Sequence, residues 1–152
     1  MGEDLVAFRD RRGRLGVLQL HCPHRGTSLE YGIVSEAGIR CCYHGWLFDV
    51  DGKILEMPSE PSSSTLKDRL FQGAYPAMEC NGIVFAYMGP PEKKPDFPIY
   101  DSHVIENYRH EPGLCQFVPC NWLQIRENTM DPVHTSFLHT IISGTQFTDE
   151  FG

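Results

Sequence analysis

The sequence has no long hydrophobic run and no secretory start. Its longest apolar stretch, around Gly82–Met88, has the length of a strand and falls short of the roughly 18 residues that a membrane helix needs. The first four residues, Met1–Asp4, lack the basic start and apolar core of a signal peptide. These absences exclude a membrane span and predict a soluble, cytoplasmic protein.

Positive charge is also scarce. The chain has 13 Lys and Arg residues against 20 Asp and Glu residues, a formal net charge of −7. Nucleic-acid binding favours a basic face, so we expect no nucleic-acid partner. There is no internal repeat, and 152 residues with 41% hydrophobic content are enough for one compact domain, or for one small domain and part of another.

Cysteine and histidine, in contrast, are plentiful, with six and seven residues. Disulfides are rare in the cytoplasm, so these cysteines need another explanation. Cys22 lies two residues before His24, and the adjacent Cys41 and Cys42 precede His44. Thiolate and imidazole ligands suit zinc or an iron–sulfur cluster. Because each pair mixes one thiol with one imidazole, the pattern favours a [2Fe–2S] centre with two histidines on one iron and two cysteines on the other; zinc, or buried cysteines beside unrelated histidines, remain the alternatives.

The first ninety residues have the pattern of a mainly β fold. Short β-compatible runs occur at Asp4–Arg9, Leu15–Leu20, Ile39–Tyr43, Trp46–Phe48, Ala74–Met78 and Ile83–Met88. Turn signals separate them, the strongest being Asn81–Gly82, and Asp51–Gly52 marks another. Short strands with frequent turns predict an antiparallel β-sandwich or barrel.

A proline-rich segment divides the chain. Gly89–Pro98 contains four prolines in ten residues, which neither a helix nor a central strand tolerates. We therefore predict a first domain at 1–90, a linker at 91–98 and a second, α+β domain at 99–152.

Two strands and two helices are expected after the linker. The strands are predicted at Val104–Glu106 and Cys115–Pro119. Asn121 is a good N-cap, and apolar residues follow it at helical spacing, which predicts a helix at about 121–130. Asp131–Pro132 is a favoured cap and first helical residue, so a second helix should start there and run to about residue 140.

The second of these helices carries three candidate ligands. Asp131 and His134 are three residues apart and share one face. His139 is five residues beyond His134. On an ideal helix this spacing points the two side chains in directions about 140° apart around the axis. On spacing alone, two ordinary surface or core histidines are the more frequent explanation. The pair could share a metal only if the helix is distorted or the metal lies to one side of it.

The motifs around the first two pairs resemble a known family. Cys22–Gly26 and Cys41–Asp49 closely resemble the two cluster-binding loops of Rieske proteins, with a Tyr-His-Gly-Trp run typical of the oxygenase branch. The resemblance implies four ligands of a Rieske [2Fe–2S] cluster: Cys22, His24, Cys41 and His44. Cys42 is then the extra thiol, because the family places two residues between the ligand cysteine and the histidine, and only Cys41 has this spacing to His44.

The run from Asn121 to His134, with His139 after it, is similar to the start of the catalytic domain of Rieske non-haem iron oxygenases related to phthalate dioxygenase. This resemblance implies that His134 and His139 bind a mononuclear Fe(II), with the third, carboxylate ligand outside this sequence. It also implies that Asp131 bridges His44 of a neighbouring subunit to His134 and passes electrons between them.

The implied activity is that of a Rieske-type mono- or dioxygenase, of which this chain is a fragment that is inactive alone. An NAD(P)H-dependent reductase, directly or through a ferredoxin, supplies electrons. The iron then activates O₂ to hydroxylate or demethylate a small organic, often aromatic, substrate. A homo-oligomer built on trimers is expected. The alternatives are a Rieske ferredoxin that only carries electrons, which leaves 121–139 unexplained, and a structural zinc module.

An arginine-rich turn is a further candidate for function. Arg9, Arg11, Arg12 and Arg14 form a basic edge in an otherwise neutral first domain. We consider docking of the reductase at this edge as a hypothesis, with an ordinary solvated face as the more frequent alternative.

Overall fold

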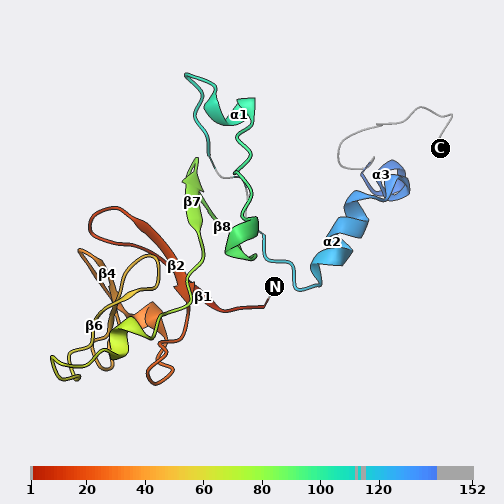
Figure 1. The fold of residues 1–152 in the computed structure, drawn as a ribbon. Helices are drawn as coiled ribbons and strands as arrows, with labels where there is room; N and C mark the ends of the chain where they lie inside the picture. The colour runs from red at the N-terminus through yellow and green to blue at the C-terminus, as the bar shows by residue number, and fades with distance from the viewer. Residues whose placement is uncertain (1, 112, 114–115, 140–152) are drawn as a thin grey trace. The chain divides into compact units, whose positions relative to one another are not determined.

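The computed structural model describes residues 2–111, 113 and 116–139. By its internal contacts the chain forms two compact units, Met1–Pro112 and Gly113–Gly152 (Figure 1). The first unit contains all the strands of the described residues, and the second contains two helices. No helix among the described residues combines the length and the apolar character needed to cross a bilayer.

The first unit begins with a hairpin of β1 (Leu5–Arg9) and β2 (Leu15–Gln19). The strands are antiparallel, with Arg9 opposite Leu15 across the turn. The carboxylate of Asp10 closes this turn by accepting hydrogen bonds from the backbone N–H groups of Arg12 and Arg14 and from the Arg14 side chain. The predicted hairpin is confirmed.

A four-stranded antiparallel sheet follows, in the order β3 (Ile33–Ser35), β4 (Gly38–Arg40), β5 (Leu47–Phe48) and β6 (Ile54–Glu56). The strands are short because turns interrupt the chain every few residues. Gly38 makes the close approach of β4 and β5 possible, since a Cβ at this position would overlap the carbonyl oxygen of Phe48. The register places Arg40, Leu47 and Glu56 in one row across β4, β5 and β6.

The third sheet is a hairpin of β7 (Ala77–Cys80) and β8 (Ile83–Ala86). Its turn residues, Asn81 and Gly82, have φ angles of 51° and 80°. Positive φ at both central residues is the geometry for which Asn-Gly is preferred, so the predicted turn is confirmed. The expected fold class, mainly antiparallel β, is confirmed as well.

One hydrophobic core joins the first hairpin to the central sheet. It is formed by buried side chains from β1, β2, the central sheet and the loops between them: Phe8, Leu18, Cys22, Leu29, Ile39, Cys41, Trp46, Phe48, Ile54 and Met57. Two cysteines of the candidate cluster loops therefore belong to the core and are held by its packing.

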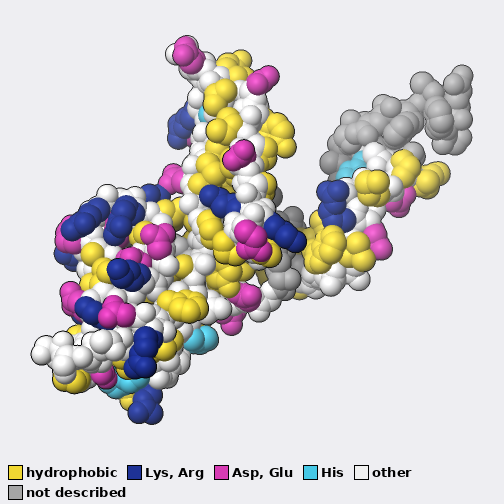
Figure 2. All heavy atoms as spheres, viewed as in Figure 1, with side chains coloured by type: hydrophobic (Ala, Val, Ile, Leu, Met, Phe, Trp, Pro, Cys, Tyr) yellow, Lys and Arg dark blue, Asp and Glu magenta, His cyan; other side chains and the backbone are white. Residues whose placement is uncertain are grey.

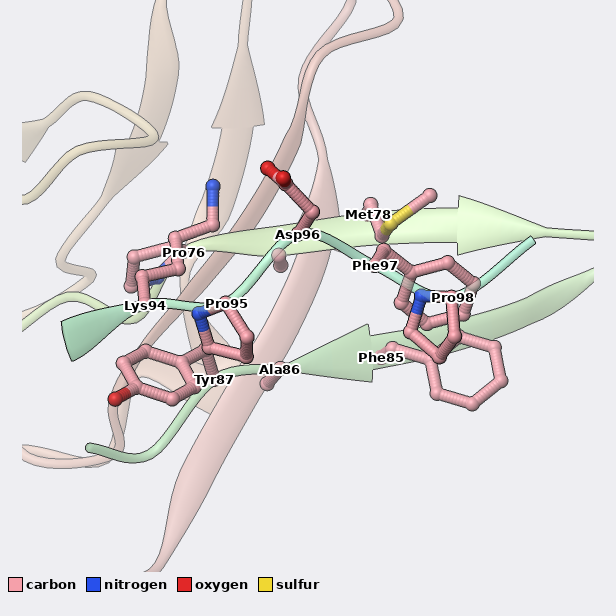
Figure 3. A pocket seen from close by; sticks show the side chains of 11 residues that line it. Pro76, Met78, Phe85, Ala86, Tyr87, Lys94, Pro95, Asp96, Phe97 and Pro98 are labelled. Atoms are coloured by element: carbon pink, nitrogen blue, oxygen red, sulfur yellow. The ribbon is translucent and has the colours of Figure 1, made fainter.

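The proline-rich segment packs against the β7–β8 hairpin. The rings of Phe97 and Phe85 lie 4.8 Å apart, and η3 (Pro91–Lys93) forms one short helical turn before them. A pocket of about 420 Å³ lies between this segment and the hairpin, with Met78, Phe85 and Phe97 in its wall (Figure 3). The division into domains at this segment remains a prediction.

The remaining short elements of the first unit are helical turns. These are η1 (Leu29–Tyr31), η2 (Leu66–Asp68) and α1 (Asp101–Val104). The prediction of strands at Val104–Glu106 and Cys115–Pro119 was wrong for the residues that the structure describes, because 104–106 and 116–119 form no strand. Cys115 lies outside the described residues. A strand needs a partner for its backbone groups, and apolar residues in a short run do not supply one.

The second unit contains α2 (Trp122–Thr129) and α3 (Pro132–Leu138). The side chain of Asn121 caps α2 by accepting from the N–H of Leu123, at 2.9 Å. Asp131 caps α3 in the same way, accepting from Val133 at 2.9 Å. Both predicted helices, and the break between them, are confirmed.

Candidate metal centres

Two loops of the first unit have the same backbone design. In each, a cysteine N–H donates to the carbonyl five residues later, from Cys22 to Thr27 at 2.9 Å and from Cys41 to Trp46 at 2.8 Å. A glycine N–H four residues after each cysteine donates back to the cysteine carbonyl, at 2.9 Å in the first loop and 3.1 Å in the second.

Those two glycines, Gly26 and Gly45, have φ angles of 71° and 74°. The left-handed conformation turns each loop sharply, and glycine adopts it without the clash that a Cβ would bring. The first loop follows β2 and the second joins β4 to β5, so both start from paired strands. The fold therefore presents one cysteine and one histidine from each of two matching turns.

The two thiols meet in the core. Cys22 and Cys41 are each 3% exposed, whereas Cys42 is exposed. Burial raises the pKa of the Cys22 thiol to about 11; the N–H of His24 lowers it, and the neighbouring thiol of Cys41 raises it further. No disulfide joins the described cysteines. At this pKa Cys22 is protonated at neutral pH, and a metal that bound both sulfurs would displace the protons and hold them as thiolates.

The two imidazoles also meet. The rings of His24 and His44 have centroids 4.4 Å apart, and Trp46 stacks on His24 with nearly parallel planes and ring centroids 4.7 Å apart. Nδ1 of His24 is buried and has no hydrogen-bond partner. Burial lowers the pKa of His24, as do the positive charges of His44 and Arg25, while Glu60 raises it. The neutral imidazole that these effects favour is the form that binds metals.

The donor set fits a Rieske cluster. Two buried thiols and two adjacent imidazoles would supply two ligands for each iron of a [2Fe–2S] centre, and a metal would satisfy the unpartnered nitrogen of His24. Among residues 2–111, 113 and 116–139, no three Cys, His, Asp or Glu side chains are grouped as they would be around a single metal ion. The four donors are arranged as a thiol pair and an imidazole pair.

The second candidate centre lies on α3. The rings of His134 and His139 have centroids 5.3 Å apart and meet edge to face. The five-residue spacing does not separate the two rings; His134 lies within α3, and His139 is the residue that follows its last residue, Leu138. Oδ2 of Asp131 lies 3.6 Å from Nδ1 of His134, which is buried and makes no hydrogen bond. Asp149 and Glu150, the carboxylates after His139, lie outside the described residues.

The basic edge is not a set of four free cations. Arg9 pairs with Glu79, and Arg14 pairs with Asp10 at 2.8 Å. The N–H of Arg11 bonds to Ser35 at the β3–β4 turn, which lies at the opposite end of β2 and β4 from the cysteine loops. Figure 2 shows basic and acidic side chains interspersed over the viewed face of the β-rich unit. This placement argues against electron delivery through the basic edge.

Sequence reasoning missed two contacts of the second loop. The guanidinium of Arg40 donates to the carbonyl of Gly45 at 2.6 Å and to the carboxylate of Glu56 at 2.5 Å. The ring of Pro58 lies 3.3 Å from the position a Cβ would take on Gly45. Glu56 is 16 residues from Arg40 and is brought near it by the register of β4, β5 and β6. Gly45 is 5 residues from Arg40, and Pro58 is 13 residues from Gly45; no spacing in the sequence signals these contacts.

Comparison with known proteins agrees with this geometry. Residues 1–75 match the Rieske [2Fe-2S] domain family. The oxygenase subunit of tert-butanol monooxygenase / tert-amyl alcohol desaturase from Aquincola tertiaricarbonis is 58% identical over 137 residues, which cover 90% of this chain and 29% of the relative. The oxygenase subunit of phthalate 4,5-dioxygenase from Pseudomonas putida is 46% identical over 141 residues, covering 91% of this chain and 31% of the relative.

A solved structure shows the same likeness in three dimensions. The crystal structure of dicamba monooxygenase bound to dicamba aligns with a TM-score of 0.71 and 27% identity, over 84% of this chain and 40% of that one. The chain spans less than half of the length of each of these three relatives. By its matching loops, its Rieske domain and relatives that extend through both helices, the chain belongs to the Rieske oxygenase family and is similar to the phthalate dioxygenase group within it.

Proposed function

We propose that this chain is the electron-accepting part, and the beginning of the iron site, of a Rieske-type mono- or dioxygenase. The observation that carries the proposal is the pair of matching loops, which places two buried thiols beside each other and two imidazoles beside each other. When bound, a Rieske cluster supplies one-electron transfer, and a mononuclear Fe(II) supplies activation of O₂.

The residues of the first unit would hold the cluster and exclude water from one side of it. Cys22 and Cys41 bind one iron as thiolates, and their burial keeps solvent from the sulfur atoms. His24 and His44 bind the other iron. Trp46 fixes the plane of the His24 ring by stacking on it, so that the imidazole reaches the metal without a large loss of side-chain entropy.

The residues of the second unit would form part of the catalytic iron site. His134 and His139 are two ligands of a 2-His-1-carboxylate set. Asp131 is held by its cap to α3 beside Nδ1 of His134, where its carboxylate would orient the imidazole by accepting a hydrogen bond from Nδ1–H. Asp131 is also our candidate for the bridge to His44 of a neighbouring subunit, in a homo-oligomer built on trimers.

The partners follow from this chemistry. An NAD(P)H-dependent reductase, directly or through a ferredoxin, would supply the electrons in the cytoplasm, and a small organic, often aromatic, molecule would be hydroxylated or demethylated. Relatives of this same segment are named as a monooxygenase and desaturase and as a dioxygenase. The type of reaction is therefore set by residues other than the two cysteine–histidine loops.

Adjacent cysteines provide the sharpest test of the cluster. We expect Cys41→Ser to abolish the visible absorption of the purified protein and its two irons per chain. The matched variant Cys42→Ser should keep both, because Cys42 is exposed. Iron and sulfide analysis under anaerobic conditions checks the result. A colourless protein that binds zinc alone, or equal loss in the two variants, would contradict the assignment.

A Rieske electron carrier is the second candidate, since the first unit contains both loops within Met1–Pro112. The full-length protein distinguishes the two. An oxygenase should bind a third iron that is lost in His134→Ala and retained in His103→Ala, a substitution at a histidine outside both centres. Two irons per chain, unchanged in His134→Ala, would favour the carrier.

A further inference from the structure

Arg40 is the residue that links the second cluster loop to the neighbouring strand. It is the last residue of β4, directly before Cys41. One guanidinium nitrogen donates to the carbonyl of Gly45 at 2.6 Å, and the other pairs with Glu56 at 2.5 Å. Its side chain is 29% exposed, so the interaction with Gly45 is partly removed from solvent.

The strand register explains why this contact forms. Arg40 is opposite Leu47, and Leu47 is opposite Glu56. Adjacent strands are about 4.8 Å apart, so Glu56 lies two strands away and within reach of an extended arginine side chain. An arginine has the length and the two-pronged donor geometry to bind a carbonyl and a carboxylate at once.

The contact acts on the part of the loop that determines its shape. Gly45 has a φ angle of 74°, and its N–H donates to the carbonyl of Cys41 at 3.1 Å. Arg40 binds the carbonyl of the same glycine, and the ring of Pro58 lies close to its Cα. The turn between Cys41 and His44 is thus held at both of its backbone polar groups and by one apolar contact.

We propose that the Arg40–Glu56 pair positions the second cluster loop and sets the reduction potential of the cluster through its two opposing charges. This inference rests on the proposed assignment of Cys41 and His44 as cluster ligands. Reduction adds one electron, and therefore one negative charge, to the cluster. The guanidinium, bound within the ligand loop, stabilises that added charge, and the carboxylate of Glu56 offsets part of the effect.

The opposing charges give opposite predictions. Glu56→Gln removes the negative charge but leaves Arg40 able to bind Gly45, so the ratio of reduced to oxidised cluster at a fixed potential should rise, on the order of threefold to tenfold. Arg40→Gln leaves Glu56 unpaired near the loop, so the ratio should fall by a similar factor. Arg40→Lys keeps the positive charge but cannot bind Gly45 and Glu56 with two separate nitrogens. Its ratio of reduced to oxidised cluster should therefore stay near that of the unaltered chain, whereas the less firmly held loop should lose the cluster faster.

The test is an anaerobic redox titration of the purified chain, followed by visible absorption and electron paramagnetic resonance, with dithionite as the electron source. Two variants at the opposite end of the central sheet and first hairpin, Arg12→Gln and Glu36→Gln, are the charge-matched controls, because both residues are exposed. Cluster content per chain is measured for each variant. If Arg40→Gln does not retain its cluster, Glu56→Gln and Arg40→Lys decide the question.

Shifts in the same direction for Glu56→Gln and Arg40→Gln would overturn the inference. So would a shift in Glu56→Gln no larger than that in Glu36→Gln, or a potential in Arg40→Lys that falls as far as in Arg40→Gln. The proposed function fails separately: it is overturned, and this inference with it, if the unaltered chain shows no [2Fe–2S] spectrum. A normal spectrum with unmoved potentials contradicts only the role of the pair.

Discussion

At the scale of single residues, the structure separates side chains of the same type by what surrounds them. Cys41 and Cys42 are neighbours in sequence, yet one is buried against Cys22 and the other faces solvent. Spacing alone left either thiol available for a metal. Strand β4 decides between them, because residues alternate between its two faces and the first position after it continues into the core.

Asp10 gives a prediction for the pH dependence of stability. Its burial acts to raise its pKa, but hydrogen bonds from the N–H of Arg14, the guanidinium of Arg14 and the N–H of Arg12 together hold the pKa below its usual value. A carboxyl with a lowered pKa stabilises the folded state above its ordinary pKa of about 3.9, and this contribution is lost as the pH falls through the lower folded value.

We therefore expect Asp10→Asn to be less stable than the unaltered chain at pH 7, with the gap closing below about pH 4. Thermal unfolding at a series of pH values measures this gap. Asp51→Asn is the control, because Asp51 is exposed and its side chain closes no comparable turn. A gap that stayed constant with pH would show that the Asp10 carboxylate does not contribute through its charge.

At the scale of elements, local signals predicted what local forces decide. The Asn81–Gly82 turn and the caps at Asn121 and Asp131 depend on neighbouring residues, and all three formed as expected. The strand expected at Val104–Glu106 did not form, because pairing depends on a distant partner. For the same reason no local pattern indicates that Arg40 reaches Glu56 across an intervening strand.

Gly38 shows how closely the elements of the central sheet are packed. Ala at this position would place a Cβ against the carbonyl oxygen of Phe48, at a φ angle of 151°. We expect Gly38→Ala to lower the free energy of unfolding by about 2–4 kcal/mol, from steric overlap together with backbone strain. Gly13→Ala also has a positive φ but open space around it, so its cost should be about 1 kcal/mol. Urea unfolding of the two variants measures the difference, and equal costs would mean that overlap with β5 is not the cause.

At the scale of the whole molecule, the chain combines a β unit whose core includes two candidate ligands with a helical unit that has its own pair of histidines. A metal that binds only the folded state stabilises that state by mass action, and thiolates in a core are costly without one. The stability of the first unit should therefore depend on its cluster, whereas the helices α2 and α3 are capped by their own residues.

Removal of the cluster should consequently act on one unit more than on the other. We expect anaerobic chelation in the presence of dithionite to lower the melting temperature of the β unit and to leave most of the helical circular dichroism signal unchanged at low temperature. Cys41→Ser, which should hold no cluster, provides the control, because its melting temperature should not respond to the chelator. If the unaltered chain and Cys41→Ser responded equally, the chelator would be acting elsewhere than on a cluster held by the two loops. If the helical signal disappeared together with the β transition, the two units would unfold as one, against the division that their internal contacts indicate.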